Sequence, residues 1–179
     1  MSALPMFLHP GQTIEALQLI PGMNVADFGA GSGFYAVAVA KVVGDKGKVF
    51  AVDVQKELLD RLKNESRRQR LSNVEVVWGD LEKLRGSGLK DATLDAVLIT
   101  NVLFQVKDKL ALAREALRVL KPKGKALVID WQASGGLGPR PETAISVDQA
   151  QDIFLQAGFS FEKRISAGAH HYGIIFKKS

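Results

Sequence analysis

Short apolar runs alternate along the chain with longer segments in which apolar residues recur every three or four positions. Runs rich in Val, Ile and Phe are typical of strands buried in a sheet, and the longer periodic segments are typical of helices with one buried face. The runs predict strands at 25–28, 48–53, 74–78, 94–99, 125–131, 159–165 and 171–177. The periodic segments predict helices at 13–20, 33–43 and 55–69, one with an inner stripe of Leu110, Ala113, Leu117 and Leu120, and one between Ser146 and Gly158.

Capping residues and turn formers mark the ends of these elements. Thr13 is a candidate N-cap of the first helix, and Ser146 and Gln149 have the spacing of a capping box at the start of the last one. Pro122 and Gly124 predict a turn before the fifth strand.

Strands that alternate with helices predict a doubly wound α/β fold, in which a mostly parallel sheet is covered on both faces. The last two strands follow each other without a helix, so we expect them to be antiparallel neighbours. Residues 79–93 show no clear period and are given at most one helical turn. We interpret residues 1–179 as a single domain, with residues 1–20 as an N-terminal helix or lid.

Three glycines follow the first predicted strand at alternate positions, Gly29, Gly31 and Gly33. A strand, a tight glycine-rich turn and a helix form the arrangement in which backbone approaches a nucleotide cofactor. The dinucleotide pattern G-x-G-x-x-G would have its third glycine at position 34, where this chain has Phe34. The turn therefore argues against NAD or FAD, and Phe34 is expected to pack rather than to contact a ligand.

Polar residues also follow the next three predicted strands. Asp53 ends the second strand, Asp80 follows the third, and Asn101 follows the fourth. Ligands of doubly wound sheets bind beyond the carboxyl ends of the strands. The sequence therefore predicts one ligand site at this edge of the sheet.

Composition limits the class of protein. With 46% hydrophobic and 24% charged residues, the 179-residue chain is typical of a globular domain with a substantial core. It has no apolar run of the roughly 20 residues that span a membrane and no signal-peptide pattern, so we expect a cytoplasmic location. Cysteine is absent, which excludes disulfides, thiolate zinc sites and cysteine nucleophiles, and we expect no metal site.

The net charge of +5 raises the question of a nucleic-acid partner. Basic residues are dispersed except for Arg67, Arg68 and Arg70 at the end of a predicted helix. Cations at a helix C-terminus also interact favourably with the helix dipole. We therefore favour a solvated helix end and keep RNA binding as the alternative.

Five segments together resemble the class I S-adenosylmethionine-dependent methyltransferases, in the order expected for that family. They are VADFGAGSGFY, VFAVDV, VVWGDL, LDAVLITNVLFQV and LKPKGKALVID. The resemblance covers nearly the whole chain. It implies a Rossmann-like, seven-stranded sheet that ends in an antiparallel hairpin, and S-adenosylmethionine as the cofactor.

The resemblance also implies which residues hold the cofactor. Asp27 would lie near the methionine amino group, Asp53 would accept hydrogen bonds from the ribose hydroxyls, and Asp80 would bond the adenine amine. An Asp at the end of a strand can instead cap the next helix, and Asn is also a common turn residue. The full set implied by the family is Asp27, Gly29, Ala30, Gly31, Gly33, Asp53, Val54, Asp80, Leu81 and Asn101.

Within that set, the glycine-rich turn would let backbone approach the methionine and ribose. Val54 would pack on the adenine, and Leu81 would supply a backbone amide. Asn101 would lie beside the transferred methyl group.

The acceptor is less constrained than the cofactor. The Asn-Pro-Pro-Tyr signature of amino-group and many nucleic-acid methyltransferases is absent after the fourth strand, where Thr100-Asn101-Val102-Leu103 stands. The segments LVIDWQ, QAGF and HHYGIIF are similar to the ubiquinone/menaquinone C-methyltransferase group, which implies a small-molecule acceptor. Two alternatives remain, an RNA methyltransferase and a cofactor-binding protein of this fold without turnover.

A catalytic base is needed only if the acceptor must lose a proton. Weak candidates are His170 and His171, which we otherwise expect to begin a strand with one ring packed and one solvated, and Asp130 at the end of the fifth strand. Trp131 either walls a planar substrate or packs. The apolar segment 6–10, which contains His9, is a candidate lid or homodimer contact.

Overall fold

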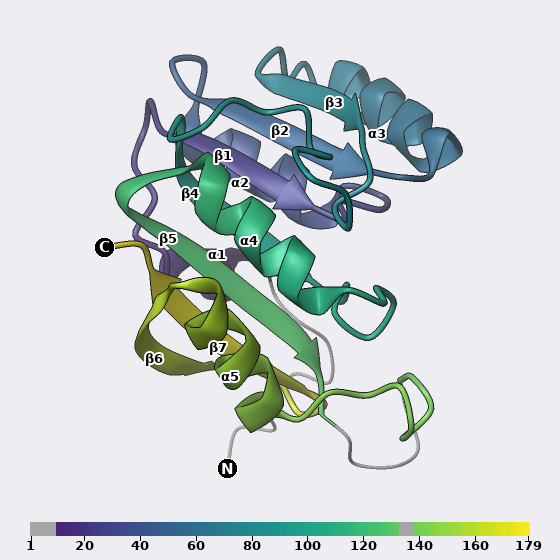
Figure 1. Ribbon diagram of the computed structural model, residues 1–179. Coiled ribbons are helices and arrows are strands. Elements are labelled where there is room, and N and C mark those ends of the chain that lie inside the picture. The colour runs from purple at the N-terminus through teal and green to yellow at the C-terminus, as the bar shows by residue number, and fades with distance from the viewer. Residues whose placement is uncertain (1–9, 133–137) are drawn as a thin grey trace, which may run out of the picture.

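In the computed structural model, which describes residues 10–132 and 138–179, the apolar runs pair into one seven-stranded sheet (Figure 1). The strand order is β3-β2-β1-β4-β5-β7-β6; β1 to β5 are parallel, and β7 is antiparallel to both of its neighbours. The predicted fold class and C-terminal hairpin are confirmed. The strands are β1 (Asn24–Phe28), β2 (Lys48–Asp53), β3 (Val74–Trp78), β4 (Leu94–Thr100), β5 (Leu120–Trp131), β6 (Ser160–Ser166) and β7 (His171–Lys177).

Helices cover both faces of this sheet and bury a core on each side. Side chains of α1, α2 and α3 share one hydrophobic cluster with the sheet, and those of α4 and α5 share the other. The central strands are buried on both faces, which explains their nearly continuous apolar sequences. The helices are α1 (Pro10–Glu15), α2 (Phe34–Val43), α3 (Lys56–Arg68), α4 (Lys109–Val119) and α5 (Val147–Ala157).

The first helix lies earlier in the chain than predicted. Within the described residues it covers Pro10–Glu15. Thr13 is buried inside this helix, so its assignment as N-cap is wrong. Gln18 then adopts a left-handed φ of 55° in the turn that follows.

The buried face of α4 differs from the predicted stripe. Its buried apolar residues are Leu112, Ala113, Ala116 and Val119. Leu110 and Leu117 are only half-buried, and Leu120 already belongs to β5. The predicted turn at 122–124 is instead an irregularity within β5, because Leu120 pairs with Leu94 and Lys125 pairs with Ala96.

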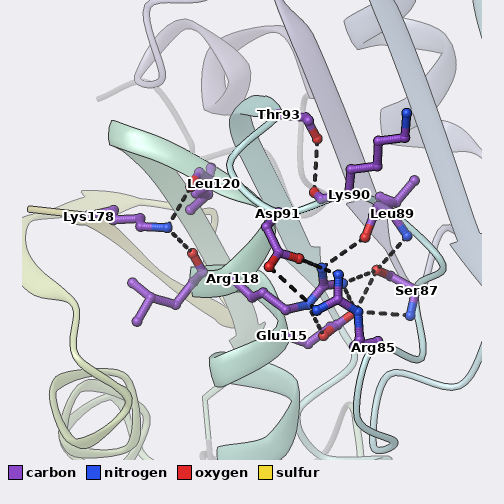
Figure 2. Close-up of polar contacts among 11 residues, drawn as sticks. Arg85, Ser87, Leu89, Lys90, Asp91, Thr93, Glu115, Arg118, Leu120 and Lys178 are labelled. Atoms are coloured by element: carbon purple, nitrogen blue, oxygen red, sulfur yellow. Dashed lines mark hydrogen bonds and ion pairs between the residues drawn. The ribbon is translucent and has the colours of Figure 1, made fainter.

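The segment between β3 and β4 forms turns rather than a helix, and polar contacts fix it to α4 (Figure 2). Arg118 donates hydrogen bonds to Glu115, to Asp91 and to the carbonyl of Leu89. Glu115 in turn accepts from the backbone N–H of Ser87 at 3.0 Å and from its hydroxyl at 2.5 Å. These contacts give the irregular segment a defined position beside the sheet.

The C-terminal part of the chain follows its predicted signals closely. Ser146 and Gln149 form both hydrogen bonds of the capping box, and Gly158 ends α5 with a left-handed φ of 108°. β6 is an edge strand, in which Ile165 is half-buried and the other residues are exposed. Its register with β7 shifts between Phe161 and Lys163.

Candidate functional site

The glycine-rich turn lies between β1 and α2, and its backbone conformation requires glycine at all three positions. Gly29, Gly31 and Gly33 have φ values of 75°, 53° and 84°, which side chains rarely tolerate. A Cβ at Gly29 would collide with Val102, and one at Gly33 would collide with Leu62. Apart from Gly31 itself and its two chain neighbours, no described atom lies within 4 Å of such a Cβ at Gly31. Gly31 therefore presents bare backbone to open space.

Phe34 does not have the packing role expected from the sequence. It is the first residue of α2, its side chain is 57% exposed, and its ring contacts Tyr35 edge-on. The close approach between the turn and α3 is made at Gly33, one residue earlier. The dinucleotide spacing is thus broken in structure as well as in sequence.

Asp53 ends β2 and faces the glycine-rich turn. Its Oδ2 accepts a hydrogen bond from the N–H of Gly31 at 2.9 Å, and its Oδ1 accepts one from the N–H of Gln55, the N-cap residue of α3, also at 2.9 Å. Each carboxylate oxygen retains a further lone pair. Asp53 therefore fixes the turn and the start of α3, and it can still bind a ligand hydroxyl.

Asp27 is a buried carboxyl at the carboxyl end of β1, with an exposed fraction of 1%. Burial raises its pKa to about 7; a hydrogen bond from the Ala36 backbone opposes this shift, and the nearby Asp53 adds to it. Its Oδ1 atom has no hydrogen-bond partner among the described residues. An unsatisfied buried acceptor beside the turn is suited to a cationic donor.

A cleft of about 320 Å³ brings most of the predicted residues together. Gly29, Gly31, Asp53, Val54, Asp80 and Leu81 all line it. Ala30, Gly33, Asp27 and Asn101 are not part of its lining. Other lining residues were not predicted, and no motif in the sequence marks them: Gln55, Leu58, Gly79, Glu82, Val102, Gln105 and Val106.

Asn101 follows β4 in a left-handed conformation, with a φ of 56°. Its N–H donates to the carbonyl of Ile129 at 2.8 Å, and its own carbonyl accepts from Gln105 Nε2 at 2.7 Å. Its side-chain Oδ1 is buried and has no hydrogen-bond partner within the described part of the chain. The backbone role of a turn residue is thus combined with an unused side-chain acceptor.

A second, larger groove of about 720 Å³ lies next to this cleft. Its walls come from the segment after β4, from the residues before α5, and from α5 itself. Gln105 and Val106 line both the cleft and the groove, so the two are neighbours. The apolar part of the groove is Phe104, Val106, Ala144, Ile145 and Ile153.

Of the candidate bases, Asp130 and His171 are both buried and contact neighbouring residues. Asp130 is 1% exposed, and its Oδ2 accepts from the N–H of Leu103 while its Oδ1 accepts from that of Trp131, both at 2.8 Å. Burial raises its pKa to about 6 against the effect of these hydrogen bonds. The ring of His171 lies 4.1 Å from that of Trp131, and burial, with a smaller effect of His170, lowers its pKa.

Neither Asp130 nor His171 belongs to the lining given above for the cleft or the groove. We expected one of the two histidine rings to be packed and the other solvated. His171 is buried as expected, but His170 is half-buried. Trp131 packs on His171. His9 and most of the candidate lid lie outside the described residues.

The described residues also bear on metal ions and membranes as partners. Within residues 10–132 and 138–179, no group of three His, Cys, Asp or Glu side chains is placed to hold a metal ion. Over the same residues, no helix has the length and apolar character needed to cross a membrane.

Comparison with known families assigns the chain to a family. Residues 19–157 match the model of a family described as a methyltransferase domain. The chain belongs to this family. The match spans the glycine-rich turn, the cleft and α5, and it confirms the predicted methyltransferase family.

Individual relatives refine the placement of this methyltransferase domain. The ubiquinone/menaquinone biosynthesis C-methyltransferase UbiE of Shewanella woodyi is 36% identical over 121 residues, 66% of this chain and 47% of that protein. A protein-L-isoaspartate O-methyltransferase of Methanococcus maripaludis is 34% identical over 106 residues, 54% of this chain and 49% of that protein. The chain thus spans about half the length of the curated relatives it matches.

A solved structure matches almost the whole methyltransferase domain. It is a SAM-dependent methyltransferase from Aquifex aeolicus, with a TM-score of 0.89 and 30% identity over 97% of this chain and 92% of that one. S-adenosylmethionine is therefore the cofactor of the family to which this domain belongs, as predicted.

The residues present fit this cofactor. S-adenosylmethionine carries an ammonium group, ribose hydroxyls and an adenine. The cleft offers free lone pairs on Asp53 and an apolar Val54 that is 56% exposed. Behind the cleft lining, the buried Asp27 has an unpartnered carboxylate oxygen. Bare backbone at Gly31 leaves room for a ligand to approach. Asp80 also lines the cleft, although its carboxylate accepts from Glu82 N–H at 3.1 Å and pairs with Lys83 at 3.2 Å.

Proposed function

We propose that this methyltransferase domain transfers the methyl group of S-adenosylmethionine to a small-molecule acceptor. The observation that carries the proposal is the shared wall at Gln105 and Val106, which makes a groove of mixed polar and apolar lining the direct neighbour of the cofactor cleft. A groove of this size, with an apolar part and several polar side chains, suits a small molecule that carries both apolar and polar groups. The similarity to a ubiquinone/menaquinone C-methyltransferase supports the same class of acceptor.

The cofactor-binding roles are part of this proposal. Asp27 binds the ammonium group through its unpartnered oxygen, Asp53 binds the ribose hydroxyls, and Asp80 binds the adenine amine. Val54 packs on the adenine, and the backbone of Leu81 lies at its edge. The residue beside the reacting methyl is Asn101.

The bound cofactor supplies an activated methyl group on a sulfonium, so the protein has little covalent chemistry to perform. Its contribution is to hold the acceptor in line with the methyl group and to exclude water. Apolar groove residues such as Phe104, Ile145 and Ile153 serve both purposes.

Calorimetry with S-adenosylhomocysteine tests the cofactor site. We expect Asp53→Ala to weaken binding by about 10- to 100-fold, the effect of losing charge-assisted hydrogen bonds to two hydroxyls. Asp53→Asn keeps one acceptor oxygen and should lose less. Asp60→Ala, which removes an exposed carboxylate from α3, is the matched control and should bind like the wild type.

Transfer of radiolabelled methyl to a panel of acceptors tests the substrate class. The panel holds demethylated quinols and simple phenols, with an isoaspartyl peptide and unmodified tRNA as competing classes. Transfer to a quinol or phenol supports the proposal. Transfer to the peptide or the tRNA alone, or cofactor binding without transfer to any member, would overturn it.

A further inference from the structure

Residues 102–108, which connect β4 to α4, form the wall between the cofactor cleft and the acceptor groove. Val102 lines the cleft and covers Gly29 of the glycine-rich turn. Gln105 and Val106 line both sites, and Phe104 and Lys107 line the groove. The position of this segment therefore sets the shape of both sites at once.

Carboxylates from other parts of the chain hold this segment at its two ends. Near its start, Leu103 N–H donates to Asp130 Oδ2 at 2.8 Å. Near its end, the N–H groups of Lys107 and Asp108 both donate to Glu82 Oε1, each at 2.7 Å. Asp108 is the N-cap of α4, so the Glu82 carboxylate also lies where the helix dipole favours negative charge.

Glu82 is itself connected to the cofactor side. Its backbone N–H donates to Asp80 Oδ1 at 3.1 Å, and both residues line the cofactor cleft together with Leu81. A ligand that contacts residues 80 and 81 therefore restricts the backbone from which the Glu82 side chain extends. The contacts run from the cleft through Asp80 and Glu82 to Lys107 and Asp108.

We propose that Glu82 is a positioning residue that couples occupancy of the cofactor cleft to the wall of the acceptor groove. The proposal rests on the proposed function, because it needs a cofactor in the cleft. The bound cofactor reduces the motion of residues 80–82. Because Glu82 Oε1 accepts hydrogen bonds from two backbone amides at the start of α4, the motion of those amides is reduced as well. The acceptor groove is then better formed when the methyl donor is present.

Amide hydrogen exchange, measured with and without S-adenosylhomocysteine, tests the coupling directly. In the wild type we expect the ligand to slow exchange of the Lys107 and Asp108 amides several-fold. In Glu82→Ala both amides should exchange about tenfold faster than in the wild type, with no response to the ligand. Glu82→Gln keeps an acceptor oxygen and should restore part of the protection.

Two comparisons separate coupling from a general loss of structure. The Leu103 amide, held by Asp130, should keep its protection in Glu82→Ala. Glu75→Ala, which removes an exposed carboxylate that pairs with Lys48, should leave all three amides unchanged. Calorimetry of Glu82→Ala with S-adenosylhomocysteine gives the ligand concentration that saturates this variant, so that amide exchange is compared at equal occupancy.

Failure of the coupling and failure of the proposed function give different results. Ligand-independent exchange at Lys107 and Asp108 in a wild type that binds S-adenosylhomocysteine would overturn the coupling. Normal protection of these amides in Glu82→Ala would also overturn it. A wild type that does not bind S-adenosylhomocysteine would contradict the proposed function instead.

Discussion

At the scale of single residues, Asp27 carries an unusual combination of burial and unsatisfied hydrogen bonding. Its side chain is almost fully buried, its pKa is raised to about 7, and its Oδ1 has no partner among the described residues. A buried carboxylate with one unpartnered oxygen destabilises the fold in its charged form. A cationic ligand group would remove that cost, which links the ionisation of Asp27 to binding.

This linkage predicts that affinity for S-adenosylhomocysteine rises as the pH increases from 6 to 8. Asp27 must be ionised to bind the ligand ammonium, and its pKa of about 7 lies in this window. Calorimetry at pH 6, 7 and 8 measures the effect. Asp27→Asn should bind weakly with no pH dependence of this origin. Equal pH dependence in Asp27→Asn and the wild type would contradict the assignment.

Stability without ligand should change in the opposite sense. The pKa of Asp27 is raised on folding, so the folded state binds the proton more tightly than the unfolded chain does. The stability contributed by protonated Asp27 is present below the unfolded pKa of about 3.9 and is lost as the pH rises through about 7. We therefore expect Asp27→Asn to increase the free energy of unfolding at pH 8, as measured by urea denaturation.

At the scale of elements, the connection from β3 to β4 shows how a segment without periodicity is held in place. Burial alone would raise the pKa of Glu115, but hydrogen bonds from Arg118 and Ser87 bring it below its ordinary value. The carboxylate is thus charged, buried and paired (Figure 2). Next to this network, Lys178 donates to the carbonyls of Leu117 and Leu120, where α4 meets β5.

Removal of Arg118 tests this arrangement. Arg118→Ala leaves Glu115 as a buried, unpaired charge, and we expect a loss of about 3 kcal/mol in the free energy of unfolding, measured by urea denaturation. Arg85→Ala removes an arginine from an exposed pair with Asp91 and should cost less than about 0.5 kcal/mol. Similar losses in the two variants would show that the buried network is not the source of the stability.

The elements that sequence predicted well are those with local signals. The capping box at Ser146 and the glycine at 158 mark α5 because each acts within one turn of the helix. The errors have a different origin. Leu120 has the spacing of a helical residue, but its pairing with Leu94 across the sheet assigns it to β5. Long-range pairing of this kind leaves no trace in the local period.

At the scale of the whole molecule, the cofactor cleft is assembled from four separate parts of the chain. Residues after β1, β2, β3 and β4 all line it. The strand-end residues could be predicted because parallel strands bring their carboxyl ends to one edge. Glu82 could not, because its role depends on hydrogen bonds from the backbone of Lys107 and Asp108, which lie far away in the sequence. Gln105 could not, because no sequence motif marks its hydrogen bond to the carbonyl of Asn101.

A ligand that contacts all four parts should stabilise the whole fold. At a concentration about 100 times its dissociation constant, S-adenosylhomocysteine should add about 2.7 kcal/mol of stability. For a chain of this length that corresponds to a rise in Tm of about 5 to 10 °C, which thermal denaturation monitored by circular dichroism would show. NAD is the control and should leave the Tm unchanged, since the turn lacks the dinucleotide spacing. An equal shift with NAD would contradict the cofactor assignment.

The edge strand β6 bears on how molecules of this protein meet one another. An open strand edge is a template on which another chain can add a strand and begin aggregation. Along β6, Glu162, Lys163 and Arg164 place charges of both signs, and the register shift beside Phe161 interrupts a regular ladder. An incoming strand would have to bury those charges and follow an irregular hydrogen-bonding pattern. The sheet therefore ends at an edge that discourages its own extension, even in a concentrated solution.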